Sequence, residues 1–426
     1  MPHDLLVLGA GPAGLGAALE AARAGARVAI ADGADRVGGL CVTLRRDGLA
    51  YDLGGHIPFV RDERRRRWLE ELLGGDLVRV RRPVACVLDG HVVRGRYLDQ
   101  RPPATAGGDG DGGSAYDFLA ARFGAGFVER TMRRYLEKVD GMPLERIPAI
   151  RPKRLMEDQA APDGFWYPAE GIGQLMDAMA AAAEALGAEL LLGRRVEQIA
   201  VSGSRVRAVT LQGPDGPAEV AAGAVVAGLP PTVVARLVEP PPAADLPSFP
   251  MRAAALVYLV LDRGPLTPEP WIQVDDPRVP FARMFEVANW STRLVPDGRT
   301  VLGCECYADP GSALWSMSDA ELAQACAAAL RDPLGLLDEP EAARLAEVVR
   351  IPRAWPLVAL DRLAAARRAA GLLDGLGGLQ VAQGGDVVQA IEAGERAAHA
   401  VLAGSPGTAG ADGTQAGAGA DALSYG

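Results

Sequence analysis

The chain has 426 residues, 49% of them hydrophobic and 23% charged, with a formal net charge of −10 at pH 7. This length predicts two connected domains, and the apolar content excludes a largely disordered chain. The acidic balance argues against a nucleic-acid partner, and no run approaches the ~18 apolar residues of a membrane span. Because the first predicted strand begins at Asp4, we expect no signal peptide and a cytoplasmic protein.

A dinucleotide-binding motif opens the chain. A predicted strand over residues 4–8 leads into Gly9-x-Gly11-x-x-Gly14, a helix-like run and a second strand that ends in Asp32. Gly9 permits the tight turn, Gly11 lets the backbone approach a pyrophosphate, and Gly14 lets the helix pack close to the sheet. The helix N-terminus points free N–H groups at the phosphates, and Asp32 can accept hydrogen bonds from ribose hydroxyls. These elements in this order predict a dinucleotide site rather than an unrelated glycine-rich turn.

The remaining periodicities predict short strands, hairpins and amphipathic helices without an internal repeat. We expect a glycine-rich mobile loop at 101–113, Pro-rich connections from about 139 to 168, and a disordered tail over 404–426. The predicted regular elements, in chain order, are hairpins at 43–52 and 85–94 around a helix at 62–74, helices at 115–138 and 171–186, paired strands at 196–210, strands at 224–227, 253–261, 281–287 and 301–307, a helix at 319–330, a strand at 379–382 and a helix at 388–402.

A second part of a dinucleotide site closes the chain. Gln383-Gly384-Gly385-Asp386 leads from the last strand into the last helix. A ligand that touches both chain ends must be long and run through the middle of the protein, which favours FAD over NAD. Asp386 can bind a ribityl or phosphate-adjacent hydroxyl, and the helix amides can stabilise negative charge on a reduced flavin.

The five cysteines form no CxxC pair, and Cys304 and Cys306 alternate on a predicted strand. We expect reduced, buried thiols and no metal site.

These and further motifs resemble the FAD-dependent amine oxidase/protoporphyrinogen oxidase superfamily. A closer likeness is to its bacterial protoporphyrinogen-oxidase-like branch, which is similar to UDP-galactopyranose mutase. The motifs of the superfamily are Gly9-x-Gly11-x-x-Gly14, Asp32, Asp35-Arg36-x-Gly38-Gly39, residues 167–173 and Gly385-Asp386 with Gly394, Ala397 and Ala398. Those of the branch are residues 52–56, 135–143, 280–286 and 314–319.

The resemblance implies an α/β fold with a discontinuous Rossmann-type, glutathione-reductase-like FAD domain and an inserted α+β substrate domain. The FAD domain would comprise residues 1–80, 165–230 and 350–403, and the substrate domain 81–164 and 231–349. Adenosine would lie beside Asp32 and Val196. The residues expected to bind FAD are Gly9, Gly11, Pro12, Ala13, Gly14, Asp32, Gly33, Arg36, Gly38, Gly39, Leu40, Gly54, Gly55, His56, Val196, Gly385, Asp386 and Val387.

Two residues are candidates for chemistry. His56 follows two glycines that let backbone press against a flat ring, so we expect flavin contact, with either an acid/base role or a purely structural one. Arg283 and Glu286 lie three apart on one strand and face opposite sides. Arg283 could bind an anionic or carbonyl group of the substrate, or form a surface salt bridge. Four aromatic residues could line the pocket or belong to the core: Tyr258, Trp271, Trp290 and Trp355.

Two departures from the family narrow the function. Amine oxidases of this superfamily place a lysine by water near flavin N5, whereas Lys138 and Lys153 are the only lysines here and lie outside that region. Residues 383–389 also lack the tyrosines and the Asn- or Asp-rich stretch of the mutase-like relatives. We therefore expect an FAD-dependent oxidoreductase that transfers hydride from a small organic substrate to flavin N5, with oxygen or another acceptor as oxidant. The alternatives are a flavin-dependent mutase that acts on a sugar nucleotide and a flavin-binding protein without turnover.

Overall fold

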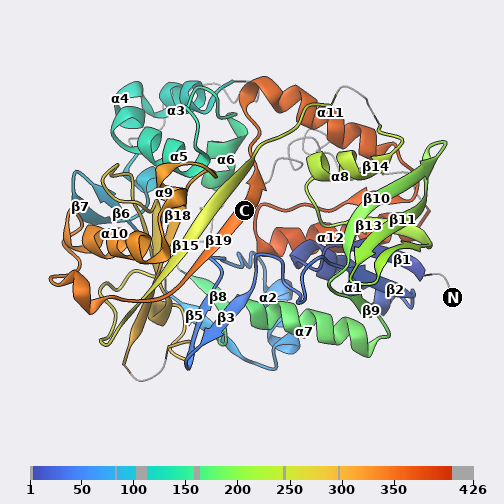
Figure 1. Cartoon of the computed structure of the whole chain (residues 1–426), viewed down its shortest axis with the longest axis horizontal. Coiled ribbons are helices and arrows are strands. Elements are labelled where there is room, and N and C mark those ends of the chain that lie inside the picture. Colours follow the sequence, from blue (N-terminus) through green and yellow to red (C-terminus); the bar gives the residue numbers. More distant parts are fainter. Residues whose placement is uncertain are drawn as a thin grey trace.

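The computed structural model describes residues 3–81, 84–101, 113–157, 164–242, 246–295 and 298–404. The loop expected at 101–113 and the tail expected at 404–426 fall almost wholly outside these ranges. The described chain forms two lobes, with the long strands β15 and β19 running between them (Figure 1).

The first lobe is built on a five-stranded parallel sheet with the strand order β20-β13-β1-β2-β9. Its central strand β1 is mostly apolar because both faces of the sheet are covered by other elements. The sheet draws its strands from the beginning, middle and end of the chain. They are β1 (His3–Leu8), β2 (Val28–Ala31), β9 (Glu189–Leu191), β13 (Ala222–Ala227) and β20 (Leu379–Val381).

Three helices, α1 (Pro12–Arg23), α7 (Ile172–Ala185) and α12 (Val387–Leu402), pack on one face of this sheet. The first and last helices of the chain lie against each other with almost no space between their backbones. A Cβ added to Gly394 would overlap the carbonyl oxygen of Ala13. This close crossing brings the two halves of the predicted dinucleotide motif together, as the sequence suggested.

A four-stranded sheet with the order β12-β11-β10-β14 packs on the other face of the parallel sheet. The helices α8 and α11 belong to the same apolar cluster. These elements are β10 (Arg195–Ser202), β11 (Arg205–Gly213), β12 (Gly216–Val220), α8 (Pro231–Leu237), β14 (Val238–Glu239) and α11 (Leu363–Asp374).

The second lobe is built on a seven-stranded sheet, β19-β15-β18-β17-β16-β6-β7. All its pairs are antiparallel except β16 with β6. The strands are β6 (Val84–Leu88), β7 (His91–Arg94), β15 (Met251–Leu261), β16 (Trp271–Gln273), β17 (Arg283–Glu286), β18 (Thr300–Tyr307) and β19 (Arg344–Pro356). Thus β19 crosses the domain boundary expected at 349/350.

Side-chain alternation along β15 explains how the lobes join. Val257 and Leu259 face a cluster beneath α10 (Asp319–Arg331), whereas Leu256 and Tyr258 face the core of the first lobe. Both faces of the strand are therefore buried, which accounts for its continuous apolar sequence. The free, buried Cys304 and Cys306 point toward the α10 side, as expected from their alternation.

Helices cover the far end of the seven-stranded sheet. The helical stretch expected at 115–138 breaks between α3 and α4 at Gly124, whose φ is +83°. The helix α6, which begins two residues before Pro152, was not expected, because we read this stretch as Pro-rich connection. A proline in the first turn is compatible with a helix. The helices are α3 (Ala115–Phe123), α4 (Ala125–Phe127), α5 (Arg133–Asp140) and α6 (Ile150–Glu157).

Two short antiparallel ribbons and a helix complete the described fold. The hairpin β3–β4 turns at Asp47 and Gly48, which both have positive φ, as the Asp-Gly turn predicts. The strand β8 pairs with β5. It also lies within the stretch from about 139 to 168 that we expected to be a Pro-rich connection. These elements are β3 (Thr43–Arg46), β4 (Leu49–Asp52), α2 (Glu63–Leu72), β5 (Leu77–Val80) and β8 (Phe165–Pro168).

Buried Asp52 fixes the point at which the Gly54–His56 segment leaves β4. Its carboxylate accepts a hydrogen bond from the Ile172 amide at 3.0 Å and another from the Tyr167 hydroxyl. Its carbonyl accepts from the Tyr258 hydroxyl at 2.6 Å. Elements from both lobes thus hold this segment in place.

Candidate active site

One cavity of about 400 Å³ extends from the glycine motif of the first lobe to the helices of the second. It brings together the two chain ends and residues of the seven-stranded sheet. The predicted cofactor residues on its wall are Gly9, Gly11, Pro12, Asp32, Gly39, Leu40, Gly55, His56, Gly385, Asp386 and Val387.

The glycine end of the cavity has the geometry of a phosphate cradle. The helix α1 begins at Pro12 without a side-chain cap, so its first amides lack a side-chain acceptor. A Cβ added to Gly11 would meet nothing closer than 3.9 Å, which leaves its open side for a ligand. In contrast, a Cβ on Gly14 would overlap the carbonyl of Gly9. Gly14 therefore supports the site through helix–strand packing.

Asp32 is oriented by the backbone around it. One oxygen accepts from the Ala10 amide at 2.7 Å and the other from the Ala34 amide at 2.8 Å. Each carboxylate oxygen has a second lone pair, so the group remains able to accept a hydrogen bond from a ligand at the cavity wall.

The C-terminal helix also begins at the cavity. Asp386 caps it, accepting from the amides of Val388 at 2.8 Å and Gln389 at 3.0 Å. The other carboxylate oxygen accepts from Arg61 at 2.8 Å. Burial raises the pKa of Asp386, although the Gln389 amide and Arg61 oppose this. Asp386 therefore accepts from two of the helix amides that we expected to face a reduced flavin. The sequence did not reveal the ion pair between Asp386 and Arg61.

Several predicted cofactor residues do not line this cavity. Arg36 is exposed, and Val196 lies half-buried on β10. Ala13 lines a neighbouring cavity of about 200 Å³. A Cβ on Gly38 would lie 2.6 Å from the carbonyl oxygen of Cys41, so this glycine supports the loop. Their contact with FAD stays a prediction, as it does for Gly14, Gly33 and Gly54.

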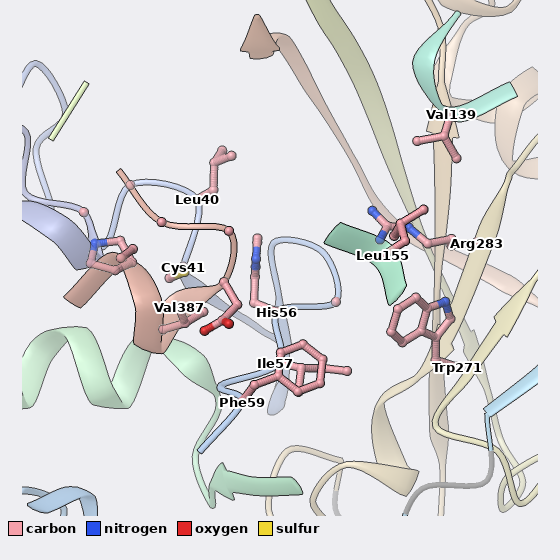
Figure 2. Close-up of a pocket in the computed structure, with 18 of the residues that line it drawn as sticks. Leu40, Cys41, His56, Ile57, Phe59, Val139, Leu155, Trp271, Arg283 and Val387 are labelled. Carbon is pink, nitrogen blue, oxygen red and sulfur yellow. The ribbon is translucent and has the colours of Figure 1, made fainter. Parts of the chain in front are cut away.

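His56 lies midway along the cavity. Figure 2 shows it between Leu40, Cys41 and Val387 on one side and Trp271 and Arg283 on the other. Its Nε2 lies 3.0 Å from the Leu53 carbonyl oxygen. Because a carbonyl only accepts, this contact requires a proton on Nε2, and the ring also hydrogen-bonds with the Leu40 backbone.

The charge state of His56 reflects two opposing effects. Burial lowers the pKa of this imidazole, while the nearby Glu305 carboxylate opposes the shift. The net lowering favours the neutral ring at pH 7.

A buried ion pair lies behind His56. Glu305 and Arg283 face each other across β17 and β18, with 2.6 Å between Oε2 and Nε. The other Glu305 oxygen accepts from the Gly55 amide at 2.9 Å, and Tyr307 hydrogen-bonds with both charged groups. Glu305 thus connects the cofactor-side Gly54–His56 segment to Arg283.

This network keeps both partners ionised. Burial disfavours the Glu305 carboxylate, but Arg283, the Tyr307 hydroxyl and the Gly55 amide together hold the pKa of Glu305 below its ordinary value. Burial likewise disfavours charge on Arg283, and Glu305 overcomes it, so the Arg283 pKa is raised. As expected, Arg283 and Glu286 face opposite sides of the strand. Arg283 lines the cavity, whereas Glu286 points away from it and accepts from the amides of Leu266 and Thr267.

The sequence interpretation missed Glu305 and Tyr307. The alternation that places Cys304 and Cys306 beneath α10 also places Glu305, between them, and Tyr307, after them, on the opposite face. That pattern indicated which face of the strand Glu305 occupies, but not that Glu305 pairs with Arg283.

Beyond His56 the cavity continues as a chamber between the seven-stranded sheet and the helices of the second lobe. Its wall is mainly apolar and aromatic, with three arginines. Of the four aromatic candidates, Trp271 lines it; Tyr258 and Trp290 pack in the core, and Trp355 lines the smaller neighbouring cavity. The chamber residues are Arg96, Tyr97, Leu98, Met132, Tyr135, Val139, Arg151, Leu155, Trp271, Gln273 and Arg283.

Neither lysine lines the cavity. Lys138 donates to the Asp276 carbonyl at 3.0 Å, and burial lowers its pKa to about 8. Cys41 lines the cavity as a free thiol whose pKa is raised by burial. Within the described ranges, no three His, Cys, Asp or Glu residues gather in a way that could hold a metal ion. No helix in the described part of the chain has the length and apolarity that crossing a bilayer requires.

Comparison with known proteins agrees with this geometry. Residues 113–402 match the family model of flavin containing amine oxidoreductases, and residues 7–72 match an NAD(P)-binding Rossmann-like domain. Among curated proteins, a ferredoxin–NADP reductase of Paraburkholderia phytofirmans is 44% identical over 70 residues. That match spans 16% of this chain and 19% of the reductase.

Solved structures resemble the whole fold at low sequence identity. Reduced UDP-galactopyranose mutase is 18% identical with a TM-score of 0.76, and the alignment covers 100% of both chains. A protein from Exiguobacterium sp. 255-15, described as a putative protoporphyrinogen oxidase, is 18% identical with a TM-score of 0.70 over 93% of this chain and 98% of that one. A redesigned putrescine oxidase is 18% identical with a TM-score of 0.68 over 94% of this chain and 99% of that one.

The family implies FAD, and the cavity fits it. The open face of Gly11, the uncapped start of α1 and the carboxylate of Asp32 provide one end of a dinucleotide site. The Gly385–Val387 turn reaches the same cavity from the other end of the chain. The family model matches more than half of this chain. The chain therefore belongs to the flavin containing amine oxidoreductase family and has FAD as its cofactor.

Proposed function

We propose that this protein oxidises a small organic substrate by hydride transfer to FAD, forming a C=C, C=N or C=O bond. Bound FAD supplies the hydride acceptor. The observation that carries the proposal is the single cavity that joins the glycine cradle, His56 and the substrate chamber. A molecule in the chamber would lie beside the cofactor without crossing bulk solvent.

The chain's own residues would orient the substrate and exclude water. Apolar side chains such as Met132, Val139 and Leu155 line the chamber. Burial lowers the pKa of His56 and favours its neutral ring at pH 7, so we do not assign it the role of a charged acid. No carboxylate lines the chamber among the described residues. Positioning over the cofactor, rather than a strong base, would therefore supply most of the acceleration.

Anaerobic spectroscopy tests the proposal. Protein loaded with FAD should lose its visible flavin absorbance when the correct substrate is added and regain it when an acceptor such as oxygen or a quinone is supplied. Gly11→Val is the matched control, because a Cβ at this position would meet no protein atom closer than 3.9 Å and would extend the side chain into the cradle. This variant should fold normally, bind no FAD and show no bleaching. A wild-type protein that remains colourless with excess FAD would overturn the proposal.

A flavin-dependent mutase is the second candidate, because the full-length similarity includes reduced UDP-galactopyranose mutase. Residues 383–389 argue against it, since they contain no tyrosine. Isomerisation of a sugar nucleotide that requires prior reduction with dithionite would favour the mutase. Bleaching by a substrate would favour the oxidoreductase.

A further inference from the structure

Charge on the chamber wall indicates which substrates fit. Arg96, Arg151 and Arg283 line the chamber. Each has an acidic partner, but these partners lie behind the arginines and do not line the cavity: Asp99, Asp140 and Glu305. A ligand therefore meets guanidinium groups first.

The two acids on the cavity wall lie elsewhere. Asp32 belongs to the glycine cradle and Asp386 caps α12. Both lie at the cofactor end of the cavity. In the described chamber, an ammonium group would find three positive charges and no carboxylate.

The aromatic residues of the chamber wall do not make up for the missing carboxylate. An aromatic face can attract a cation, but the guanidinium of Arg283 already lies over the rings of Trp271 and Tyr307, at 5.6 and 5.4 Å from their centroids. A substrate ammonium would compete with a fixed internal cation for the same surface.

Buried Tyr135 adds a directed hydroxyl donor. The side-chain oxygen of Gln273 accepts from the Tyr97 amide at 3.1 Å, which fixes the orientation of the Gln273 amide. Its nitrogen therefore donates to the Tyr135 oxygen, 3.2 Å away. Since that hydrogen bond uses a lone pair of Tyr135, the tyrosine's own proton remains available to a ligand at the cavity wall.

Arg151 and Arg283 both act on this hydroxyl. Burial raises the pKa of Tyr135, and the charges of Arg283 and Arg151 oppose the increase. The two arginines come from β17 and α6 and line the chamber together with Tyr135. A hydroxyl donor and two guanidinium groups on one cavity wall are suited to a carboxylate.

We propose that Tyr135, Arg151 and Arg283 form a subsite for the carboxylate of an organic acid, and that the chamber excludes ammonium substrates. The inference rests on the proposed function, because it specifies the substrate class of the same cavity. The apolar side chains of Met132, Val139 and Leu155 would hold the uncharged body of that acid. The chain would then oxidise acids rather than cationic amines.

Three probes with one carbon skeleton test the charge preference: benzoate, benzamide and benzylamine, which are anionic, neutral and cationic at pH 7. Each is titrated into the FAD-loaded protein and followed by calorimetry and by the flavin spectrum. We expect benzoate to bind at least about ten-fold more tightly than benzylamine, as a charge-assisted hydrogen bond would give. Equal or tighter binding of benzylamine, or no binding of benzoate at millimolar concentration, would overturn the subsite.

Two variants locate the effect. Arg151→Gln should weaken benzoate binding about ten-fold and leave benzamide nearly unchanged, and Tyr135→Phe should act in the same direction while preserving the ring. Lys153→Gln is the control, because it removes a positive charge from the same helix but lies outside the cavity wall. Identical losses in Arg151→Gln and Lys153→Gln would contradict a local subsite.

These binding measurements need no turnover. If the protein binds benzylamine tightly and its flavin is still bleached by some substrate, the acid subsite is refuted and the oxidoreductase proposal stands. Absence of FAD binding would refute the oxidoreductase proposal itself.

Discussion

Glu305 retains a negative charge in the interior because Arg283, Tyr307 and the Gly55 amide surround it. A buried ion pair often contributes little compared with two apolar residues, yet removal of one partner is costly because the other charge is left alone. The arrangement therefore behaves as a unit.

We expect Glu305→Ala to destabilise the apo protein by about 3–5 kcal/mol, the usual range for one broken buried pair. The double variant Glu305→Ala, Arg283→Met should recover a large part of that loss, since neither charge remains. Urea unfolding of the two variants and of Arg283→Met gives the coupling energy. Additive losses would show that the two side chains contribute independently.

His56 predicts a pH dependence of opposite sign to that of a salt-bridged histidine. Burial lowers its pKa in the folded state below its ordinary value, so the unfolded chain takes up this proton first. The stabilising effect of the neutral ring is complete above about pH 6.5 and decreases as the pH falls toward the lower folded pKa. Wild-type protein should therefore lose more stability between pH 7.5 and 5.5 than His56→Gln. Parallel curves from chemical denaturation would argue against the lowered pKa.

At the scale of elements, the crossing of α1 and α12 determines whether the two halves of the dinucleotide site meet. Gly394→Ala would place a methyl group against the Ala13 carbonyl and force the helices apart. We expect a loss of stability above about 1 kcal/mol, as overpacking typically causes, together with weaker FAD binding. Thermal unfolding and FAD titration measure the two effects.

Gly371→Ala is the matched control for this substitution. Gly371 lies inside α11, and nothing would lie within 4 Å of an added Cβ. Helix propensity alone should then stabilise the protein by up to about 1 kcal/mol. A destabilised Gly371→Ala, or an unaffected Gly394→Ala, would contradict the packing argument.

The elements that the sequence predicted well have strong periodicity or clear turn residues. Examples are α12, the β3–β4 hairpin and the continuous apolar strand β15. The strand β19 was not predicted, because its sequence contains Pro352, Pro356 and several charged residues. As an edge strand it pairs on one side with β15, where proline and charge are tolerated.

The cofactor half of the site was more predictable than the substrate half. Glycine spacing and strand order reflect local backbone geometry, so Gly9, Gly11 and Asp32, which line the cavity, could be named from the sequence. The contact between Arg283 and Glu305 depends on strand register, which no short motif encodes. Tyr135 and Arg151 reach the chamber through the placement of whole helices, so their sequence neighbours gave no indication of it.

At the scale of the molecule, the chain passes repeatedly between the lobes. The parallel sheet contains strands from three separate stretches of sequence, and Tyr258 of β15 stacks on Tyr51 of β4 with 4.2 Å between ring centroids. The same apolar cluster includes residues of both lobes. Neither lobe can lose its structure without exposing the core of the other.

We therefore expect one cooperative unfolding transition rather than two. We expect FAD to contact segments near both ends of the chain, which line one cavity, so it should move the whole transition to higher temperature. At a free concentration 100 times its Kd, the added stability would be about 2.7 kcal/mol. Calorimetry with and without FAD measures this shift, and Gly11→Val should show the transition without the shift. Two separate transitions, with FAD moving only one of them, would mean that the lobes fold independently and that the interlobe core contributes little to stability.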